Sequence, residues 1–127
     1  MTRAVADTSV FVAEESGREL GPLPDEIGVS VITAAELELG VLRAVDSESR
    51  ASRLATLSRV RSTFPLLPVD PETGSLFARL ADAALREGRK LRRHDTWIAA
   101  TALRHGAPVV TQDKDFSKFD SVEVIFV

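Results

Sequence analysis

The chain has 127 residues, 44% of them hydrophobic and 28% charged, which is typical of one globular domain and excludes a disordered or membrane-embedded chain. Its net charge of −3 argues against general coating of nucleic acid, which depends on an excess of Lys and Arg. The absence of cysteine excludes disulfides, iron–sulfur clusters and thiolate zinc sites, so any metal must be held by oxygen or imidazole ligands.

The N-terminal stretch is apolar, but Asp7 interrupts it. We therefore interpret residues 3–6 as a buried strand and not as part of a signal peptide, with a polar turn at residues 7–9 before the apolar residues 10–12. No later stretch reaches the roughly 20 apolar residues of a membrane-spanning helix. We expect a single domain over residues 1–127, located in the cytoplasm and without membrane contact.

Strands and helices alternate along the rest of the chain. Residues 17–25 predict a loop, residues 28–32 predict a strand rich in β-branched side chains, and Thr33 is expected to cap a helix that begins at Ala34. The remaining expected elements are a helix over 47–63, an edge strand over 65–70 that contains Pro68, helices over 71–87 and 95–105, and strands over 108–111 and 122–126. This order predicts an α/β fold with a mostly parallel sheet and helices on both faces.

Acidic residues fall at the junctions between these elements, namely Asp7, Glu36, Asp95 and Asp113. In open parallel sheets, ligands bind beyond the carboxyl ends of the strands, where Asp7, Glu36 and Asp113 are expected. The helix that begins at Asp95 leads into the strand that runs back toward Asp113, so this helix must also start near that edge. The sequence therefore predicts one acidic cluster.

Most of these acids also have a purely structural interpretation. Thr33 and Glu36 fit a capping box, Asp95 fits a helix N-cap, and Asp113 fits an Asx turn. Asp7, directly after a buried strand, has no evident structural task. The acids taken together therefore favour a functional site over a set of unrelated structural roles.

A cluster of carboxylates makes physical sense chiefly around a divalent cation. Without one, the charges would repel one another and raise the pKa values of some of the acids. Ligands that are all oxygen favour Mg²⁺ or Mn²⁺ over zinc. Such an ion activates a water molecule and stabilises the charge that develops on phosphate oxygens, so the expected chemistry is phosphodiester hydrolysis.

At these residues the sequence resembles the PIN-domain nucleases, and in particular the VapC toxins. The matching stretches are Ala6 to Phe11, Ser30 to Gly40, Asp95 to Ala102 and Val110 to Phe116, in the order of the family. The resemblance implies a three-layer α/β/α sandwich of the PIN-like type and a Mg²⁺-dependent endoribonuclease that acts as the toxin of a type II toxin–antitoxin pair. It also implies a VapB-like antitoxin as partner, within a homodimer or a toxin–antitoxin hetero-oligomer.

The same resemblance implies roles for individual residues. The catalytic acids are expected to be Asp7, Glu36, Asp95 and Asp113. Asp7 and Asp95 are the expected direct metal ligands, and Asp113 is preferred as a further ligand with Asp115 as its alternative. Ser9 and Thr111 are expected beside the cluster, where each could bind a carboxylate, a water molecule or a phosphate.

A basic run ends next to Asp95 and consists of Arg86, Arg89, Lys90, Arg92 and Arg93. It is either a solvated surface or a local contact for RNA phosphate, with Arg92 and Arg93 nearest to the acids. His94 and His105 are interpreted as structural or surface residues, and Trp97 as a core residue.

The main functional alternative is a PIN-fold module that binds RNA or protein without cleaving it. Retention of the full acidic set argues against this alternative. A haloacid-dehalogenase-like phosphatase is disfavoured because Ser9 stands where that motif has a second Asp.

Overall fold

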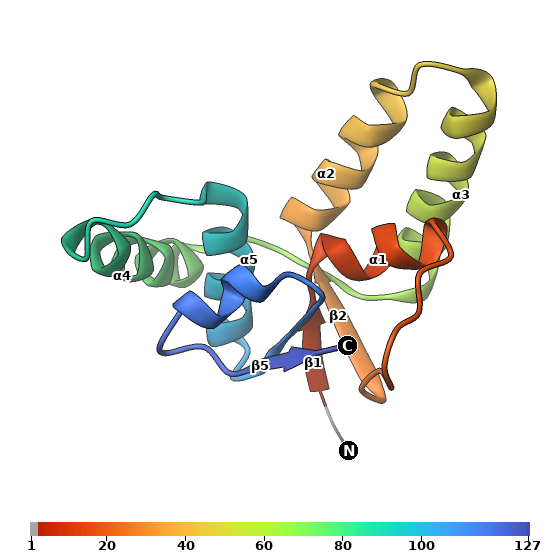
Figure 1. Cartoon of the computed structure of the whole chain (residues 1–127). Coiled ribbons are helices and arrows are strands. Elements are labelled where there is room, and N and C mark those ends of the chain that lie inside the picture. The colour runs from red at the N-terminus through yellow and green to blue at the C-terminus, as the bar shows by residue number, and fades with distance from the viewer. Residues whose placement is uncertain (1–2) are drawn as a thin grey trace.

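The computed structural model describes residues 3–127 and centres on a five-stranded sheet with strand order β3-β2-β1-β4-β5 (Figure 1). The strands are β1 (Arg3–Ala6), β2 (Glu26–Ser30), β3 (Leu66–Leu67), β4 (Val109–Thr111) and β5 (Val124–Phe126). Every neighbouring pair runs parallel, for example with Val5 opposite both Gly28 and Val109. The predicted parallel sheet is confirmed, and β3 lies at its edge, where the adjacent Pro68 costs no internal hydrogen bond.

Helices cover both faces of this sheet, as the order of elements predicted. One face carries α4 (Pro71–Arg86), α5 (Arg93–Arg104) and the short 3-10 helix η1 (Lys114–Lys118), and the other carries α1 (Thr8–Glu15), α2 (Val31–Leu42) and α3 (Ser47–Thr63). The strand β1 serves both layers because its side chains alternate. Val5 packs in the core with Ile98 and Phe116, and Ala6 packs in the core with Phe11 and Val60. The architecture is a three-layer α/β/α sandwich.

The helix α1 was not predicted from the sequence, and α2 begins at Val31 and not at Ala34 as predicted. Residues 8–9 of the expected polar turn and the apolar residues behind them form α1, with Asp7 as its N-cap, and this helix buries Phe11 completely. The expected end of the second strand, at Val31 and Ile32, is the first turn of α2, and Ser30 caps this helix through its side chain. β-Branched residues in both places favour a strand by propensity, and tertiary packing overrides that preference.

Polar residues at the carboxyl ends of three strands lead directly into helices. Asp7 follows β1 and caps α1, Ser30 ends β2 and caps α2, and Asp113 follows β4 and caps η1. Because β1, β2 and β4 are parallel neighbours, these caps lie along one edge of the sheet. The helix starts and the predicted acids are therefore gathered on the same side of the molecule.

The helices α2 and α3 pack against each other and extend away from the sheet as an arm (Figure 1). Its surface exposes large apolar side chains, including Leu39, Leu42 and Val45, which are 55%, 71% and 95% exposed. No helix among residues 3–127 is long and apolar enough to cross a membrane.

Candidate functional site

Asp7 is the most buried acid of the site, with 4% of its surface exposed. Its Oδ2 accepts hydrogen bonds from the backbone N–H of Ser9, at 3.4 Å, and from Oγ1 of Thr111, at 2.9 Å. The first of these bonds caps α1. The expectation that Asp7 has no structural task is therefore wrong, because a carboxylate at a helix N-terminus satisfies a free backbone donor.

Thr111 and Ser9 connect the ends of β1 and β4. The Thr111 hydroxyl lies 3.1 Å from the Ser9 hydroxyl and accepts a hydrogen bond from the backbone N–H of Asp113 at 2.9 Å. The Ser9 hydroxyl in turn accepts from the backbone N–H of Gln112 at 3.0 Å. Thr111 is fully buried, so the geometry favours a role in holding Asp7 and Asp113 in place over a direct contact with substrate.

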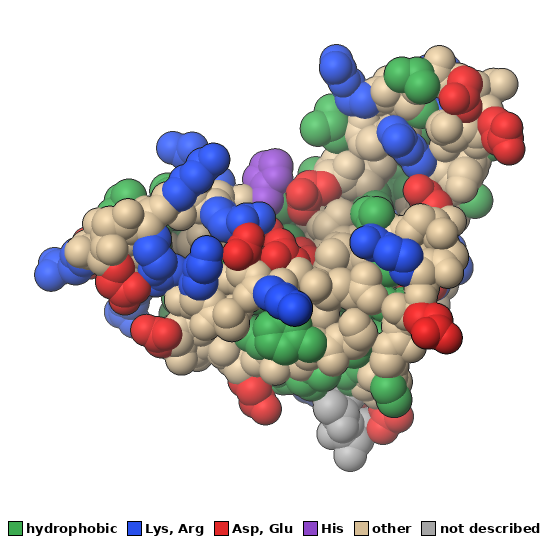
Figure 2. All heavy atoms as spheres, in the orientation of Figure 1, with side chains coloured by type: hydrophobic (Ala, Val, Ile, Leu, Met, Phe, Trp, Pro, Cys, Tyr) green, Lys and Arg blue, Asp and Glu red, His purple; other side chains and the backbone are tan. Residues whose placement is uncertain are grey.

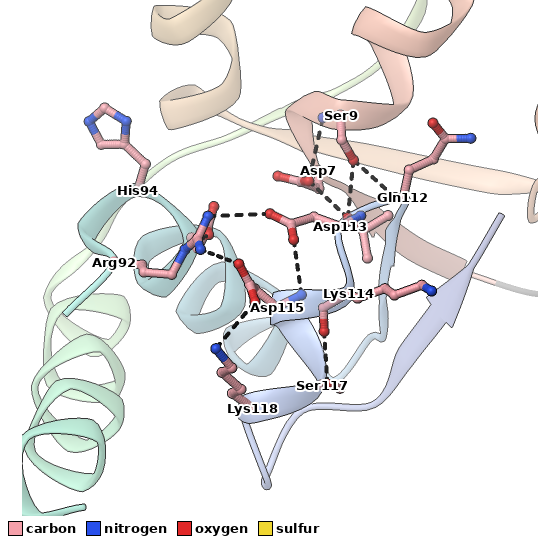
Figure 3. Close-up of polar contacts among 12 residues, drawn as sticks. Asp7, Ser9, Arg92, His94, Gln112, Asp113, Lys114, Asp115, Ser117 and Lys118 are labelled. Carbon is pink, nitrogen blue, oxygen red and sulfur yellow. Dashed lines mark hydrogen bonds and ion pairs between the residues drawn. The ribbon is translucent and has the colours of Figure 1, made fainter. Parts of the chain in front are cut away.

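Arg92 reaches into the acidic cluster (Figure 3). Its guanidinium pairs with Asp95 at 2.8 Å, with Asp113 at 3.5 Å and with Asp115. The alternatives Asp113 and Asp115 thus both face the same cation, and Lys118 adds a second pair to Asp115 at 3.2 Å. The backbone of Arg92 also occupies the N-cap position of α5, so the N-cap interpretation of Asp95 is wrong and this acid lies in the first turn instead.

Burial raises the pKa of Asp95 above its usual range, and the nearby carboxylates of Asp7 and Asp113 raise it further. The hydrogen bond from Arg92 opposes this shift. The pKa of Arg92 is raised in turn, mainly by its hydrogen bond to Asp95. These shifts describe acids close enough to repel one another, with one guanidinium as their shared counter-charge.

Glu36 lies on α2, outside the group of acids that Arg92 contacts. One of its carboxylate oxygens accepts from the Thr8 hydroxyl at 2.7 Å, and the other lies 3.3 Å from Nδ1 of His94. The capping box predicted for Thr33 and Glu36 is wrong, because Thr33 is buried inside α2 and contacts Thr8 at 3.2 Å. The contact of His94 with Glu36 was missed, since no sequence spacing relates positions so far apart.

The donor set fits a hard divalent cation. A single guanidinium already contacts three carboxylates, so one positive charge at this place lies within reach of Asp95, Asp113 and Asp115. The hydrogen bonds from Ser9 and Thr111 both reach Oδ2 of Asp7, so they do not involve its other carboxylate oxygen. Within residues 3–127, however, no three acidic or histidine side chains converge closely enough to form a finished metal site as they stand. Arg92 lies among Asp95, Asp113 and Asp115, so ligation would require these side chains to rearrange around the ion.

Two hollows adjoin the acids. An open groove of about 510 Å³ is lined by Glu36, Lys90, Leu91, Arg92, Arg93, His94 and Asp95. A smaller hollow of about 310 Å³ has Lys90, Arg92, Asp115 and Lys118 in its wall. Figure 2 shows Lys and Arg side chains gathered around the red acidic centre on this face. A larger hollow, of about 570 Å³, lies at the amino ends of the strands and contains none of the predicted site residues.

Comparison with known proteins matches the family model of the PIN domain to residues 4–122. Ribonuclease VapC5 of Mycobacterium tuberculosis is 47% identical over 97% of this chain and 94% of its own length. Ribonuclease VapC4 of the same organism is 40% identical over 98% of this chain and 97% of its own length.

Solved structures agree with these relatives. A member of the VapBC family of toxin-antitoxin systems, VapBC-5 from Mycobacterium tuberculosis, superposes with a TM-score of 0.90 at 42% identity over 100% of both chains. VapBC2 from Rickettsia felis, solved bound to a DNA fragment from its promoter, has a TM-score of 0.83 at 18% identity over 99% of both chains and shows the shared fold alone.

Proposed function

The chain belongs to the PIN-domain family and is similar throughout its length to VapC ribonucleases, and from this premise we propose that it is a Mg²⁺-dependent endoribonuclease, the toxin of a cytoplasmic type II toxin–antitoxin pair. The observation that carries the proposal is the gathering of Asp7, Asp95 and Asp113 at the carboxyl edge of the sheet. Their spacing in sequence is wide, so the fold alone brings them together.

A Mg²⁺ or Mn²⁺ ion bound there would supply an activated water molecule and positive charge for the phosphate oxygens. Asp7 and Asp95 would hold the ion, with Asp113 or Asp115 completing the acidic side of the site. Thr111 and Ser9 fix Asp7 through the hydrogen bonds between the strand ends. This positioning matters because small displacements of ligands and reacting groups lower catalytic rates strongly.

Glu36 would act from the opposite wall. Its two carboxylate oxygens are oriented by Thr8 and His94, so the side chain is held with its charge toward the groove that also contains Asp95. A carboxylate in this position can orient the attacking water by accepting a hydrogen bond from it, and can then accept its proton as a general base. The groove carries Lys90 and Arg93 as well, which would bind phosphates of an RNA strand.

An RNA cleavage assay tests the proposal. The full chain with Mg²⁺ should cleave RNA internally, and EDTA should abolish the cleavage. Asp95→Asn should lower the rate by roughly two orders of magnitude or more, because it removes a direct ligand. Asp120→Asn is the matched control, since Asp120 is exposed and lies outside the cluster.

Binding of RNA without any cleavage would instead support a non-catalytic PIN-fold binding module. Cleavage that persists in EDTA, or in Asp95→Asn at the rate of the control, would contradict the metal-dependent mechanism.

A further inference from the structure

Arg92 differs from the other members of the basic run in its partners. Arg86 pairs with Asp82 and Arg89 pairs with Glu87, each with one carboxylate at 2.8 Å on its own segment. Arg92 contacts three carboxylates from α5 and η1. A planar guanidinium with several N–H donors can bridge such a group of oxygens, which a lysine ammonium does less well.

Arg92 occupies one oxygen of each of three acids that are candidate metal ligands. The Arg92 Nε binds Oδ2 of Asp95, and its terminal nitrogens bind Oδ2 of Asp113 and of Asp115. A cation ligated by these acids and a guanidinium seated among them would place like charges in direct contact. The guanidinium and the metal ion therefore compete for the same acids on electrostatic grounds.

The surroundings of Arg92 leave its side chain room to move. It is 45% exposed and lines both the 510 Å³ groove and the 310 Å³ hollow, so free space lies on either side of its present position. It also stands at the end of the connection between α4 and α5, next to a groove that holds Lys90 and Arg93. A swing into that groove would place three cations along one path.

We propose that Arg92 is a displaceable counter-ion of the acidic cluster: it neutralises Asp95, Asp113 and Asp115 in the metal-free protein, and on metal binding it turns into the groove to bind an RNA phosphate. This inference rests on the proposed function for the identity of the metal and of the substrate. It makes substrate affinity depend on metal loading, because the same guanidinium serves either the carboxylates or the phosphate.

Metal affinity without RNA tests the first half. A calorimetric titration of the full chain with Mn²⁺ should give a Kd roughly tenfold lower for Arg92→Gln than for wild type, because the variant lacks the guanidinium charge that competes with the ion. Arg86→Gln is the matched control, because it removes the same charge from an exposed arginine whose one carboxylate partner, Asp82, lies on α4, and its Kd should stay within about twofold of wild type. Equal effects of the two changes, or weaker Mn²⁺ binding by Arg92→Gln, would overturn the proposal.

The wild-type protein supplies a measurement that does not depend on the stability of a variant. The Arg92 Nε–H resonance, assigned by its loss in Arg92→Lys, should be protected from solvent exchange in EDTA and should lose that protection at saturating Mg²⁺. An unchanged resonance would show that the guanidinium stays on the carboxylates and would contradict displacement.

RNA binding tests the second half, with a fluorescent 2′-O-methyl RNA oligonucleotide whose integrity is checked by gel. With Mn²⁺, Arg92→Gln should reduce the salt dependence of binding by about 0.7 in slope, the value for one phosphate contact on a single strand. In EDTA the slope should not change. A protein that shows these effects but cleaves no RNA would refute the proposed function and leave the inference standing, so the two failures are distinguishable.

Discussion

Asp7 combines a structural and a chemical task in one carboxylate. As the cap of α1 it accepts a backbone hydrogen bond, and as a neighbour of Asp95 it contributes charge to the cluster. We predict that Asp7→Asn abolishes cleavage and changes the free energy of unfolding in EDTA by less than about 1 kcal/mol, because Asn caps helices as well as Asp. Mg²⁺ should then raise the melting temperature of wild type more than that of the variant.

Asp7→Ala separates the two tasks. It removes the acceptor for both Ser9 and Thr111, so it should cost about 1–3 kcal/mol in thermal or urea unfolding with or without metal. Equal destabilisation by Asn and by Ala would mean that the negative charge itself holds the strand end together.

Thr111 provides a second test at this scale. Thr111→Val keeps the shape but leaves the buried Asp7 carboxylate without one donor and the backbone N–H of Asp113 without its acceptor. We expect a loss of about 1–3 kcal/mol in urea unfolding. Thr111→Ser, which keeps the hydroxyl, should retain most of that stability, and a Val variant as stable as wild type would refute the positioning role.

Individual residues of the site were predictable to different degrees. The positions of Asp7, Asp95 and Asp113 at element junctions follow from hydrophobic patterning, because apolar runs end where they stand. The sequence does not predict that the Arg92 side chain turns toward the acids. A run of basic residues indicates a solvated surface, and the position of Asp113 and Asp115 opposite Arg92 is known only from the structure. The contact between His94 and Glu36 joins α5 to α2 and depends on tertiary packing alone.

Among the elements, α4 begins with a cap that also ties it to α5. Asp70 accepts from the backbone and the hydroxyl of Thr73, both at 2.8 Å, and pairs with Arg104 at 3.0 Å. These contacts lower the pKa of Asp70 from its usual 3.8 to about 2, with the Thr73 hydrogen bonds as the main cause.

This shift fixes the sign of a pH dependence. A lowered pKa in the folded state means that Asp70 stabilises the fold above pH 3.8 and that this contribution is lost as the pH falls from 3.8 toward about 2. We predict that Asp70→Asn keeps the cap and flattens the fall in melting temperature over this acidic range. A profile identical to wild type would show that other acids dominate.

Long helices were easier to predict from the sequence than short ones. The helix over 47–63 was predicted with the bounds that α3 has, because its apolar residues recur at helical spacing. The eight-residue α1 was missed because its apolar residues are consecutive, and a short run of this kind does not distinguish a buried strand from a buried helix. From the sequence, Asp7 is interpreted only as a catalytic acid and not as the N-cap of a helix.

At the scale of the whole molecule, the arm formed by α2 and α3 exposes the large apolar side chains of Leu39, Leu42 and Val45. Neighbouring exposed apolar side chains are typical of a protein–protein interface. We predict that Leu39→Glu combined with Leu42→Glu weakens assembly with the proposed VapB-like antitoxin. Light scattering on the co-expressed pair should show a smaller mass. Leu85→Glu on α4, which is 59% exposed, is the control and should leave assembly intact.

Expression in cells tests the proposed role of the whole protein. The chain expressed alone should slow growth, and co-expression of the proposed antitoxin should restore it. Asp95→Asn should remove the effect on growth at equal protein level. Normal growth with abundant wild-type protein would contradict the assignment as a toxin.

Because β1 lies at the centre of the sheet, the acidic site can form only late in the synthesis of the chain. The first strand pairs with β4, and Asp7 depends on Thr111, which lies 104 residues later. Contacts between distant parts of a chain form late, after the intervening segments have been synthesised and ordered. A nascent chain that has not reached residue 109 contains β1 and β2 but neither β4 nor Asp113 and Asp115. The acidic site therefore stays incomplete on the ribosome until residues 109–115 have been synthesised.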